Sequence, residues 1–322
     1  GLEMRGTQSL LFGGAIMANN ADIYLEDSAF ISTMGMVDGG AIYQRGGTLE
    51  ILNSEFNSTQ AAFYGGAIFA YEMDSLNIGR SEFVATASGF GGAIIVAGSD
   101  DFDGPVEIWG NLFCNNQAAG DPAVLPPELA RGGALYMLNV DDQSIYNNVF
   151  VQGLSVGYGG ALYVEFGGET RLDIYNNTFI ANVANGVVSG GGAALFEGVL
   201  PSFFNNIVMG NSNNGITGVD FVLGSPIDFE YNLFEGNGAN FGGDLAQYEL
   251  SETNIAGDPQ IVDWGNDVQC FTDAFYTSPF SPVIDSGDPD ITLNDVGGSI
   301  NDIGAYGGPA AKVEDRDGDG WA

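Results

Sequence analysis

The chain has 322 residues, of which 42 are acidic, 7 are basic and none is histidine, so its formal net charge is −35 at pH 7. Nucleic acid and anionic membrane surfaces bind basic surfaces, so the charge excludes both as partners. The lack of histidine excludes histidine-based catalysis and histidine metal sites. No apolar run reaches about 18 residues, so we expect no membrane-spanning helix.

Two signatures repeat along the chain. The first is a Gly-Gly-Ala sequence whose early copies recur about every 26 residues and whose later copies are separated by insertions, as in a structural repeat. Its copies begin at Gly13, Gly39, Gly65, Gly91, Gly132, Gly159 and Gly191. The second is a phenylalanine followed three positions later by threonine or asparagine, as in Phe56 and Thr59. An unbroken repeat predicts one elongated body rather than several domains.

The segments between the signatures have the pattern of β-strands. Residues 49–52 and 172–175 alternate as strands do, and no stretch keeps a helical period. Two or three short strands per repeat, joined by glycine and asparagine turns, fit one coil of a parallel β-helix. The sequence therefore predicts an all-β fold, a single-stranded right-handed parallel β-helix (solenoid) of about nine coils of roughly 26 residues. The paired glycines suit a sharp turn with positive φ and a close approach of coils.

Stacked coils turn each repeat position into a column. We expect an aliphatic column at Ile16, Ile42, Ile68, Ile94, Leu135 and Leu162, and an aromatic column at the repeated phenylalanines. Two residues before each phenylalanine, a polar column is expected at an inward bend. Its members are Ser28, Ser54, Ser81, Asn111, Asn148, Asn177, Asn206 and Asn232. Their side chains can hydrogen-bond along the axis and satisfy a buried turn.

The phased GGAI and FxxN sequences, over about residues 10–245, resemble the repeat of polymorphic outer membrane proteins and related surface passengers of the pectate-lyase-like, right-handed parallel β-helix superfamily. The stretches AGDPQIVD, SPFSPVIDSGDPDI and NDIGAYGGP resemble the closing segment of secreted bacterial β-helix proteins. The resemblance implies export and an extracellular or outer cell-surface location. It implies no single activity, because this fold carries lyases, hydrolases, adhesins and scaffolds.

Three regions follow from these patterns. Residues 1–250 hold the β-helix repeats, residues 251–311 the closing segment, and residues 312–322 an acidic tail that resembles a truncated calcium loop. Because the repeat starts within a dozen residues of Gly1, we expect the chain to be a mature or excised piece of a longer protein. Cys114 and Cys270 are too few for a disulfide framework, so we expect two separate thiols, with a single bridge as the alternative.

The tail carries Asp315, Asp317 and Asp319 at alternate positions, followed by Gly320. This matches the first half of a D-x-D-x-D-G loop, in which three carboxylates converge on Ca²⁺. It resembles dockerin-type and thrombospondin type 3 loops, and a complete site would need residues beyond Ala322. The sequence predicts calcium binding in the full-length protein, with a simple acidic tail as the alternative.

Further acidic residues gather in the turn after the Gly-Gly-Ala strand. They are Asp74, Asp100, Asp101, Asp103, Asp141, Asp142, Glu165 and Glu169. Carboxylates stacked one coil apart repel unless a cation or a raised pKa relieves them. They could form a calcium site or the paired acids of a glycoside hydrolase, but a solvated turn is the interpretation we favour.

An aromatic column is expected on the outward face of the central coils, four residues before each phenylalanine. It consists of Trp109, Tyr146, Tyr175 and Phe204, with Glu107 and Asp173 two positions earlier on the same face. Such a strip suits the stacking of sugar rings. Alternatively, the insertion at 117–131 or the C-terminal segment covers it. A second outward column, with the same alternatives, is formed by Tyr43, Phe69, Ile95, Tyr136 and Tyr163.

These observations favour a non-catalytic secreted or cell-surface β-helix, acting as a passenger, adhesin or structural spacer that binds a polysaccharide or a cell surface. A calcium-dependent polysaccharide lyase or glycoside hydrolase is the first alternative. It is weakened because none of the seven basic residues lies in a recognisable lyase motif, and because polygalacturonase-type sites include a histidine. The second alternative is a filament or surface-layer component that self-associates end to end through unpaired terminal strands.

Overall fold

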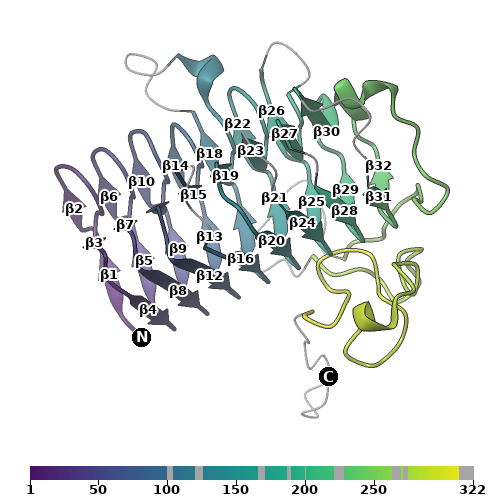
Figure 1. The fold of residues 1–322 in the computed structure, drawn as a ribbon, viewed down its shortest axis with the longest axis horizontal. Coiled ribbons are helices and arrows are strands. Elements are labelled where there is room, and N and C mark those ends of the chain that lie inside the picture. The colour runs from purple at the N-terminus through teal and green to yellow at the C-terminus, as the bar shows by residue number, and fades with distance from the viewer. Residues whose placement is uncertain are drawn as a thin grey trace.

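The structure is a computed structural model that describes residues 1–99, 104–119, 126–165, 171–186, 190–199, 201–220, 228–262, 270 and 275–311. The chain winds into a parallel β-solenoid of about eight turns, close to the nine predicted coils (Figure 1). Each strand pairs in parallel with the strand one coil before it and the strand one coil after it, as Ile68 does with Ile42 and Ile94. The prediction of an all-β parallel solenoid is confirmed.

Four sheets, numbered here in the order in which each coil enters them, make up the walls of the solenoid. The first contains β1 (Glu3–Arg5), β5 (Ala29–Ile31), β9 (Glu55–Asn57), β13 (Glu82–Val84), β17 (Leu112–Cys114), β21 (Val149–Val151), β25 (Thr178–Ile180), β29 (Ile207–Met209) and β32 (Leu233–Glu235). The second contains β2 (Gln8–Ser9), β6 (Met34–Gly35), β10 (Gln60–Ala61), β14 (Ala87–Ser88), β18 (Gln117–Ala118), β22 (Leu154–Ser155) and β26 (Val183–Ala184). The third contains β3 (Ile16–Asn19), β7 (Ile42–Arg45), β11 (Ile68–Tyr71), β15 (Ile94–Ala97), β19 (Leu135–Leu138), β23 (Leu162–Glu165), β27 (Ala194–Glu197), β30 (Asn214–Val219) and β33 (Ala239–Gly243). The fourth contains β4 (Ile23–Glu26), β8 (Thr48–Leu52), β12 (Ser75–Gly79), β16 (Val106–Trp109), β20 (Gln143–Tyr146), β24 (Leu172–Tyr175), β28 (Ser202–Phe204) and β31 (Asp228–Glu230).

A full coil therefore holds four strands, where the sequence pattern predicts two or three. The strands of the second sheet are only two residues long. Two residues are too short to show the alternation by which a strand is recognised in a sequence.

The predicted core columns are confirmed. Phe30, Phe56, Phe83, Phe113, Phe150 and Phe179 are buried and form one continuous stack. Their successive ring centroids lie 4.8 or 4.9 Å apart, which is the spacing of paired strands. The aliphatic column of the third sheet faces them, and the two sets belong to one hydrophobic cluster that runs the length of the solenoid.

The predicted polar column is also confirmed, and Asn177 shows its pattern. The Nδ2 of Asn177 donates to the carbonyls of Ile145 at 2.8 Å and Tyr175 at 3.0 Å, and to Oδ1 of Asn206 at 3.0 Å. Its Oδ1 accepts from the backbone N–H and from Nδ2 of Asn148, both at 3.0 Å. Each amide therefore hydrogen-bonds to buried polar groups at the bend of its own coil and of both neighbouring coils.

The paired glycines have the predicted structural role. Gly39 has a φ of +64°, a conformation that side chains disfavour. A Cβ on Gly40 would overlap the carbonyl oxygen of Gly66 in the next coil. The first glycine therefore permits the turn, and the second permits close stacking of coils.

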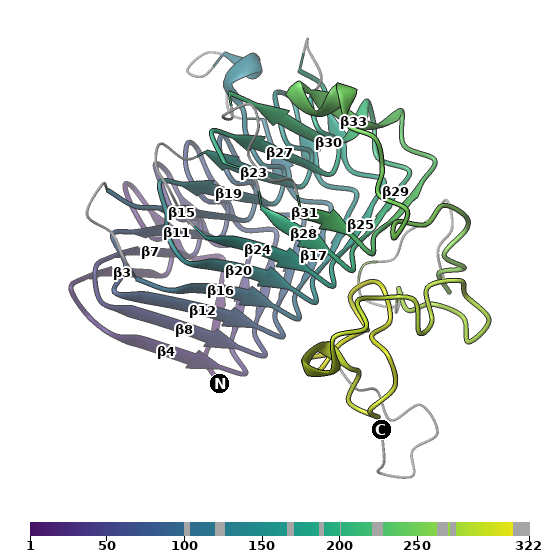
Figure 2. The same cartoon turned by 45° about the vertical axis from the view of Figure 1, so that its right-hand side comes forward.

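The C-terminal part first closes the core and then turns back along the solenoid. Phe241, Leu245 in η2 (Asp244–Gln247) and Tyr248 pack at the end of the core, where Tyr248 contacts Phe229 and Phe241. The segment that follows, which contains η3 (Ile291–Leu293), lies against the outer face of the first sheet (Figures 1 and 2). There Val283 and Ile303 pack with Ile180 and Ile207.

Cys114 and Cys270 form a disulfide, with their Cα atoms 5.9 Å apart. The prediction of two separate thiols is wrong. The two residues are 156 positions apart in the sequence, and they meet because the C-terminal segment returns to β17 on the first sheet. The bridge fastens that segment to the middle of the solenoid.

Asp38 lies in a column of isolated bridges between the second and third sheets, paired with Phe12 and Tyr64. Its side chain is buried, and its Oδ1 has no hydrogen-bond partner among the described residues. Burial raises the pKa of this carboxyl from 3.8 to about 6, and a hydrogen bond with the Tyr64 backbone lowers the pKa by a smaller amount. The folded protein therefore holds a proton on Asp38 more tightly than the unfolded chain does.

The stabilisation that comes from protonated Asp38 is complete below pH 3.8 and is lost as the pH rises through 6. We expect Asp38→Asn to raise the free energy of unfolding by about 1–2 kcal/mol at pH 7 and to change it little at pH 4. Urea titrations at the two pH values measure this. Glu252→Gln, which removes an exposed carboxylate, is the control for net charge. If Asp38→Asn and the control show the same pH dependence, Asp38 does not titrate as described.

Candidate functional site

The predicted aromatic strip lies on the outer face of the fourth sheet, on β16, β20, β24 and β28, which Figure 2 shows side by side. The strand register pairs Trp109 with Tyr146, Tyr146 with Tyr175, and Tyr175 with Phe204. All four side chains are partly exposed. The expected placement on one outward face is therefore confirmed.

The rings of the strip stack on one another. The centroids of Trp109 and Tyr146 are 6.2 Å apart, those of Tyr146 and Tyr175 are 5.0 Å apart, and those of Tyr175 and Phe204 are 5.1 Å apart, with interplanar angles of 8°, 2° and 5°. Because each ring covers the face of its neighbour, the strip presents ring edges to solvent. A ligand lying along it would meet C–H edges and tyrosine hydroxyls.

Trp109 ends the strip on the side of the earlier coils. Gly79 lies beneath it, and a Cβ on Gly79 would be 2.5 Å from the indole. The indole N–H donates to Oδ1 of Asn77 at 2.8 Å, and the Arg80 guanidinium lies 5.2 Å from the ring centroid. These contacts fix the indole and cover its remaining face, so Trp109 is a rigid end to the strip.

Polar groups line the strip. Glu107 is exposed, and Asp173 binds Arg171 with Oδ2 and Nη2 2.6 Å apart. Burial, with smaller effects of Asp173 and Glu107, raises the pKa of Tyr175 to about 12. Burial and Glu107 also raise the pKa of Tyr146. Both phenols stay protonated at neutral pH, so they can donate hydrogen bonds to a ligand and accept them from it.

The C-terminal segment, one of the two covers considered for the strip, packs elsewhere. It packs on the first sheet and on the turns that lead into it from the fourth sheet, where Asn147 and Asn176 hydrogen-bond to residues 301–307. The described end of the insertion, with η1 (Pro127–Leu129), leads into the third sheet through Arg131, which pairs with Phe90 and Tyr158. Arg131 lies away from the strip, whereas the C-terminal segment borders it at the corner, because Asn147 and Asn176 directly follow Tyr146 and Tyr175.

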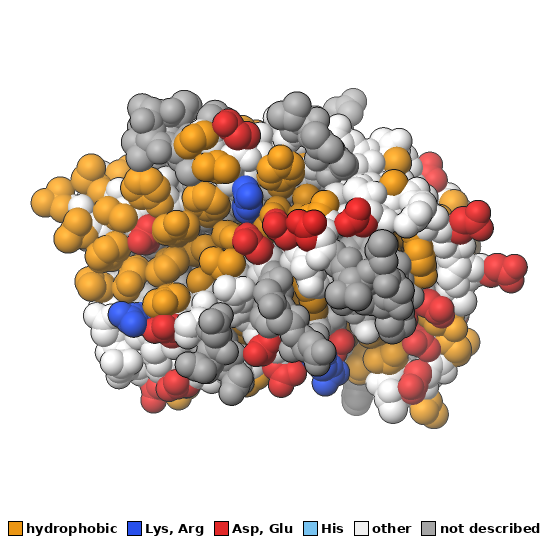
Figure 3. Space-filling model, turned by 45° about the horizontal axis from the view of Figure 1, so that its top comes forward, with side chains coloured by type: hydrophobic (Ala, Val, Ile, Leu, Met, Phe, Trp, Pro, Cys, Tyr) orange, Lys and Arg blue, Asp and Glu red, His pale blue; other side chains and the backbone are white. Residues whose placement is uncertain are grey.

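The second predicted aromatic column, on the third sheet, divides into two parts. Ile95, Tyr136 and Tyr163 are at most 5% exposed, whereas Tyr43 and Phe69 are half-buried. Figure 3 shows an apolar surface over the N-terminal end of this face. Its exposed members include Leu10, Leu11, Met17 and Tyr64. The C-terminal part of the column is therefore packed as core, and its N-terminal part borders a hydrophobic patch.

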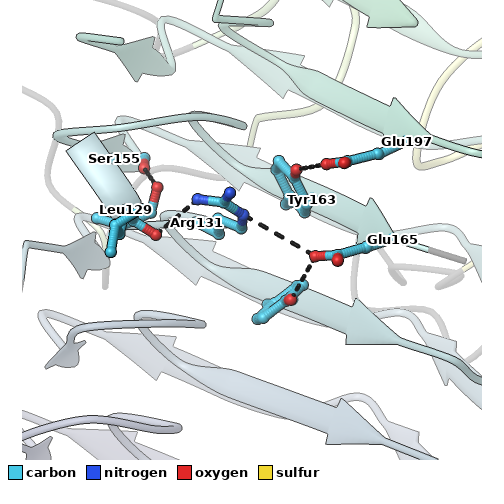
Figure 4. Close-up of polar contacts among 8 residues, drawn as sticks. Leu129, Arg131, Ser155, Tyr163, Glu165 and Glu197 are labelled. Carbon is cyan, nitrogen blue, oxygen red and sulfur yellow. Dashed lines mark hydrogen bonds and ion pairs between the residues drawn. The ribbon is translucent and has the colours of Figure 1, made fainter. Parts of the chain in front are cut away.

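A polar cluster that the sequence patterns do not predict lies on the buried part of that column (Figure 4). The hydroxyl of Tyr136 donates to Glu165 at 2.7 Å, and the hydroxyl of Tyr163 donates to Glu197. Arg131 lies 5.0 Å from the Tyr163 ring centroid, and its Nε is 3.9 Å from the Glu165 carboxylate. A tyrosine follows GGAL in GGALYML and GGALYVE, but a glutamate stands two positions after it only in GGALYVE, so the sequence signal for the cluster is incomplete.

The chemistry of this cluster is that of a structural network. Burial, together with Glu165, raises the pKa of Tyr136, and burial with Glu197 raises that of Tyr163. Phenols that stay protonated cannot accept a proton from a substrate at neutral pH. Glu165, a described member of the acidic turn, is held between Tyr136 and Arg131.

The calcium prediction is not tested. Asp315, Asp317 and Asp319 lie outside the described residues, as do Asp100, Asp101, Asp103 and Glu169 of the acidic turn. Within the described ranges, no three acidic or cysteine side chains are grouped so that they could hold a metal ion. Calcium binding by the tail stays a prediction.

No protein-family model matches the chain, and no curated protein matches it either. In the part of the chain that the structure describes, no helix is long and apolar enough to cross a membrane.

Proposed function

We propose that this protein is a non-catalytic, exported β-solenoid that binds a glycan along the strip formed by Trp109, Tyr146, Tyr175 and Phe204. The observation that carries the proposal is the strip itself, a row of ordered, partly exposed aromatic side chains on one outer face. The repeated residues are explained by their packing in the core. The four aromatic rings point outward in successive coils, and core packing does not account for them. Aromatic side chains exposed together on a soluble protein mark a binding surface.

The ligand that suits the strip is a neutral or amine-bearing polysaccharide. Glu107 and Asp173 border the rings, and the chain carries a net charge of −35, so a polyuronate would be repelled. Sugar hydroxyls can exchange hydrogen bonds with the protonated phenols and donate to the carboxylates. A linear polymer along the solenoid axis would meet one ring about every 4.8 Å.

Export and surface display complete the proposal. A disulfide is typical of oxidising compartments, so the Cys114–Cys270 bridge supports an extracellular location. The phased GGAI and FxxN sequences support membership of the pectate-lyase-like superfamily of β-helices and a role as a passenger, adhesin or spacer. The fold alone would not distinguish these roles from catalysis.

Affinity electrophoresis through gels that contain neutral, cationic or acidic polysaccharides tests the proposal. We expect the wild-type protein to be retarded by a neutral or amine-bearing polymer. The double variant Trp109→Ala/Tyr175→Ala should bind about tenfold more weakly, because the ring edges of two of the four coils and one hydroxyl are removed.

Tyr24→Ala is the matched control, since Tyr24 is a 65% exposed tyrosine of the same sheet outside the strip. Tyr175→Phe, which removes only a hydroxyl, should give an intermediate loss. Circular dichroism checks that each variant is folded. Equal retardation of wild type, double variant and Tyr24→Ala would exclude the strip as the binding surface.

A further inference from the structure

A groove runs along the corner between the fourth and first sheets. It is lined by one turn residue per coil, and each of these residues has a positive φ of 49–63°. They are Asp27, Asn53, Arg80, Gly110, Asn147, Asn176 and Asn205. We call this the corner groove. The buried polar column lies directly beneath it, since Ser28, Ser54 and Asn177 are the next residues in their coils.

The later coils of the corner groove already bind a polypeptide, the C-terminal segment of the chain itself, which turns at Gly304 to Gly307. Nδ2 of Asn147 donates to the carbonyls of Ala305 and Gly307 at 2.9 and 2.7 Å. Nδ2 of Asn176 donates to the carbonyl of Asp302 at 2.9 Å. Asn176 also exchanges side-chain hydrogen bonds with the amide of Asn301, so these coils recognise main-chain carbonyls together with one side-chain amide.

The same groove continues, unoccupied by any described segment, into the first coils. There it forms a pocket of about 370 Å³, lined by Asp27, Ser28, Ala29, Asn53, Ser54, Glu55, Arg80 and Glu82. Asn53 occupies the position of Asn147 and Asn176 and is exposed, so it can offer the same amide. Asp27 and Arg80 are two coils apart, a span of about 10 Å, which equals three extended residues.

Charge distinguishes this pocket from the part of the groove that the C-terminal segment fills. The lining has three carboxylates, Asp27, Glu55 and Glu82, against one cation, Arg80, whose guanidinium lies over Trp109. A segment with the sequence of residues 301–308, which contains Asp302, would be repelled. A lysine or arginine side chain would be attracted to Asp27 and Glu55.

We propose that the pocket in the first coils binds a basic peptide segment of a partner protein. The partner's backbone lies along the corner groove and accepts a hydrogen bond from the Asn53 amide, as residues 301–307 do from Asn147 and Asn176. Its lysine or arginine side chain lies between the Asp27 and Glu55 carboxylates. The site adjoins the end of the aromatic strip, because Arg80 lines the pocket and lies over Trp109.

Two labelled peptides that differ in one charge test the proposal by fluorescence anisotropy. One has the sequence of residues 301–308, NDIGAYGG, and the other is the same peptide with Asp302→Lys. We expect the lysine peptide to bind the full-length chain and the aspartate peptide not to bind. Binding of the lysine peptide should weaken as salt is added.

Asp27→Asn/Glu55→Gln should weaken binding of the lysine peptide about tenfold, and Asn53→Ala should weaken it several-fold without changing its salt dependence. Glu252→Gln, an exposed carboxylate far from the pocket, is the control for net charge and should have no effect. Equal binding of both peptides, no binding of either, or an equal loss in Glu252→Gln would overturn the proposal.

Discussion

Removal of the Cys114–Cys270 bridge is expected to release the C-terminal segment and to lower the free energy of unfolding by about 2–5 kcal/mol, the range typical of native disulfides. The loop that the bridge closes is long, with ends 156 positions apart in the sequence, so loss of the bridge gives the unfolded chain much more conformational freedom. The residual contacts of the segment, such as those of Asn147 and Asn176, would hold it less firmly. Chemical unfolding of Cys270→Ser in urea measures the loss of stability, and limited proteolysis locates it.

Cys114→Ser and the double variant provide the matched comparison. Since both single changes remove the same bond, the two single variants and the double variant should lose nearly the same stability. Proteolysis should cut first in the C-terminal segment and leave the solenoid whole. If a reducing agent leaves the unfolding curve and the cleavage pattern of the wild type unchanged, the bridge does not fasten the segment.

Loss of one amide from the polar column is expected to be the most damaging change to the solenoid itself. Asn177→Ala removes the three bonds donated by Nδ2 and the two accepted by Oδ1, and it takes these partners from the Asn148 backbone N–H and the Ile145 carbonyl. Each orphaned buried group costs about 1–3 kcal/mol, so we expect a loss of about 3–5 kcal/mol. Thermal and urea unfolding measure it.

Asn177→Ser provides a sharp comparison, because serines hold the same column position in the first coils. A hydroxyl can restore part of the ladder, so the serine variant should retain more stability than the alanine variant. Asn19→Ala, at an exposed strand position, should change stability little. If all three variants unfold alike, the amide ladder does not stabilise the solenoid as described.

The parts of the fold that repeat could be predicted from the sequence, and the parts that occur once could not. The phenylalanine stack and the asparagine column lie one coil apart in register, so a local spacing fixes which residues meet. The outward placement of Trp109 and Tyr175 follows from the same register. The number of strands per coil was underestimated because two-residue strands carry no periodic signal.

The sequence holds no repeated spacing that predicts contacts between distant segments. The disulfide, and the bonds of Asn147 to Ala305 and Gly307, join residues more than 150 positions apart. The contact of Arg131 with Tyr163 and Glu165 depends on how the insertion before β19 re-enters the third sheet. The sequence also indicates that the aromatic rings of the strip point outward. Only the structure shows that the rings stack and present their edges to solvent.

Binding without cleavage is the central claim, and one incubation tests it most directly. The protein is mixed with the polysaccharide that retards it most, with and without calcium, and bound fraction, polymer length and new reducing ends are followed together. We expect stable binding that Trp109→Ala/Tyr175→Ala weakens, with no change in polymer length. A steady appearance of reducing ends or unsaturated products, in proportion to protein concentration, would contradict the account and favour a lyase or hydrolase.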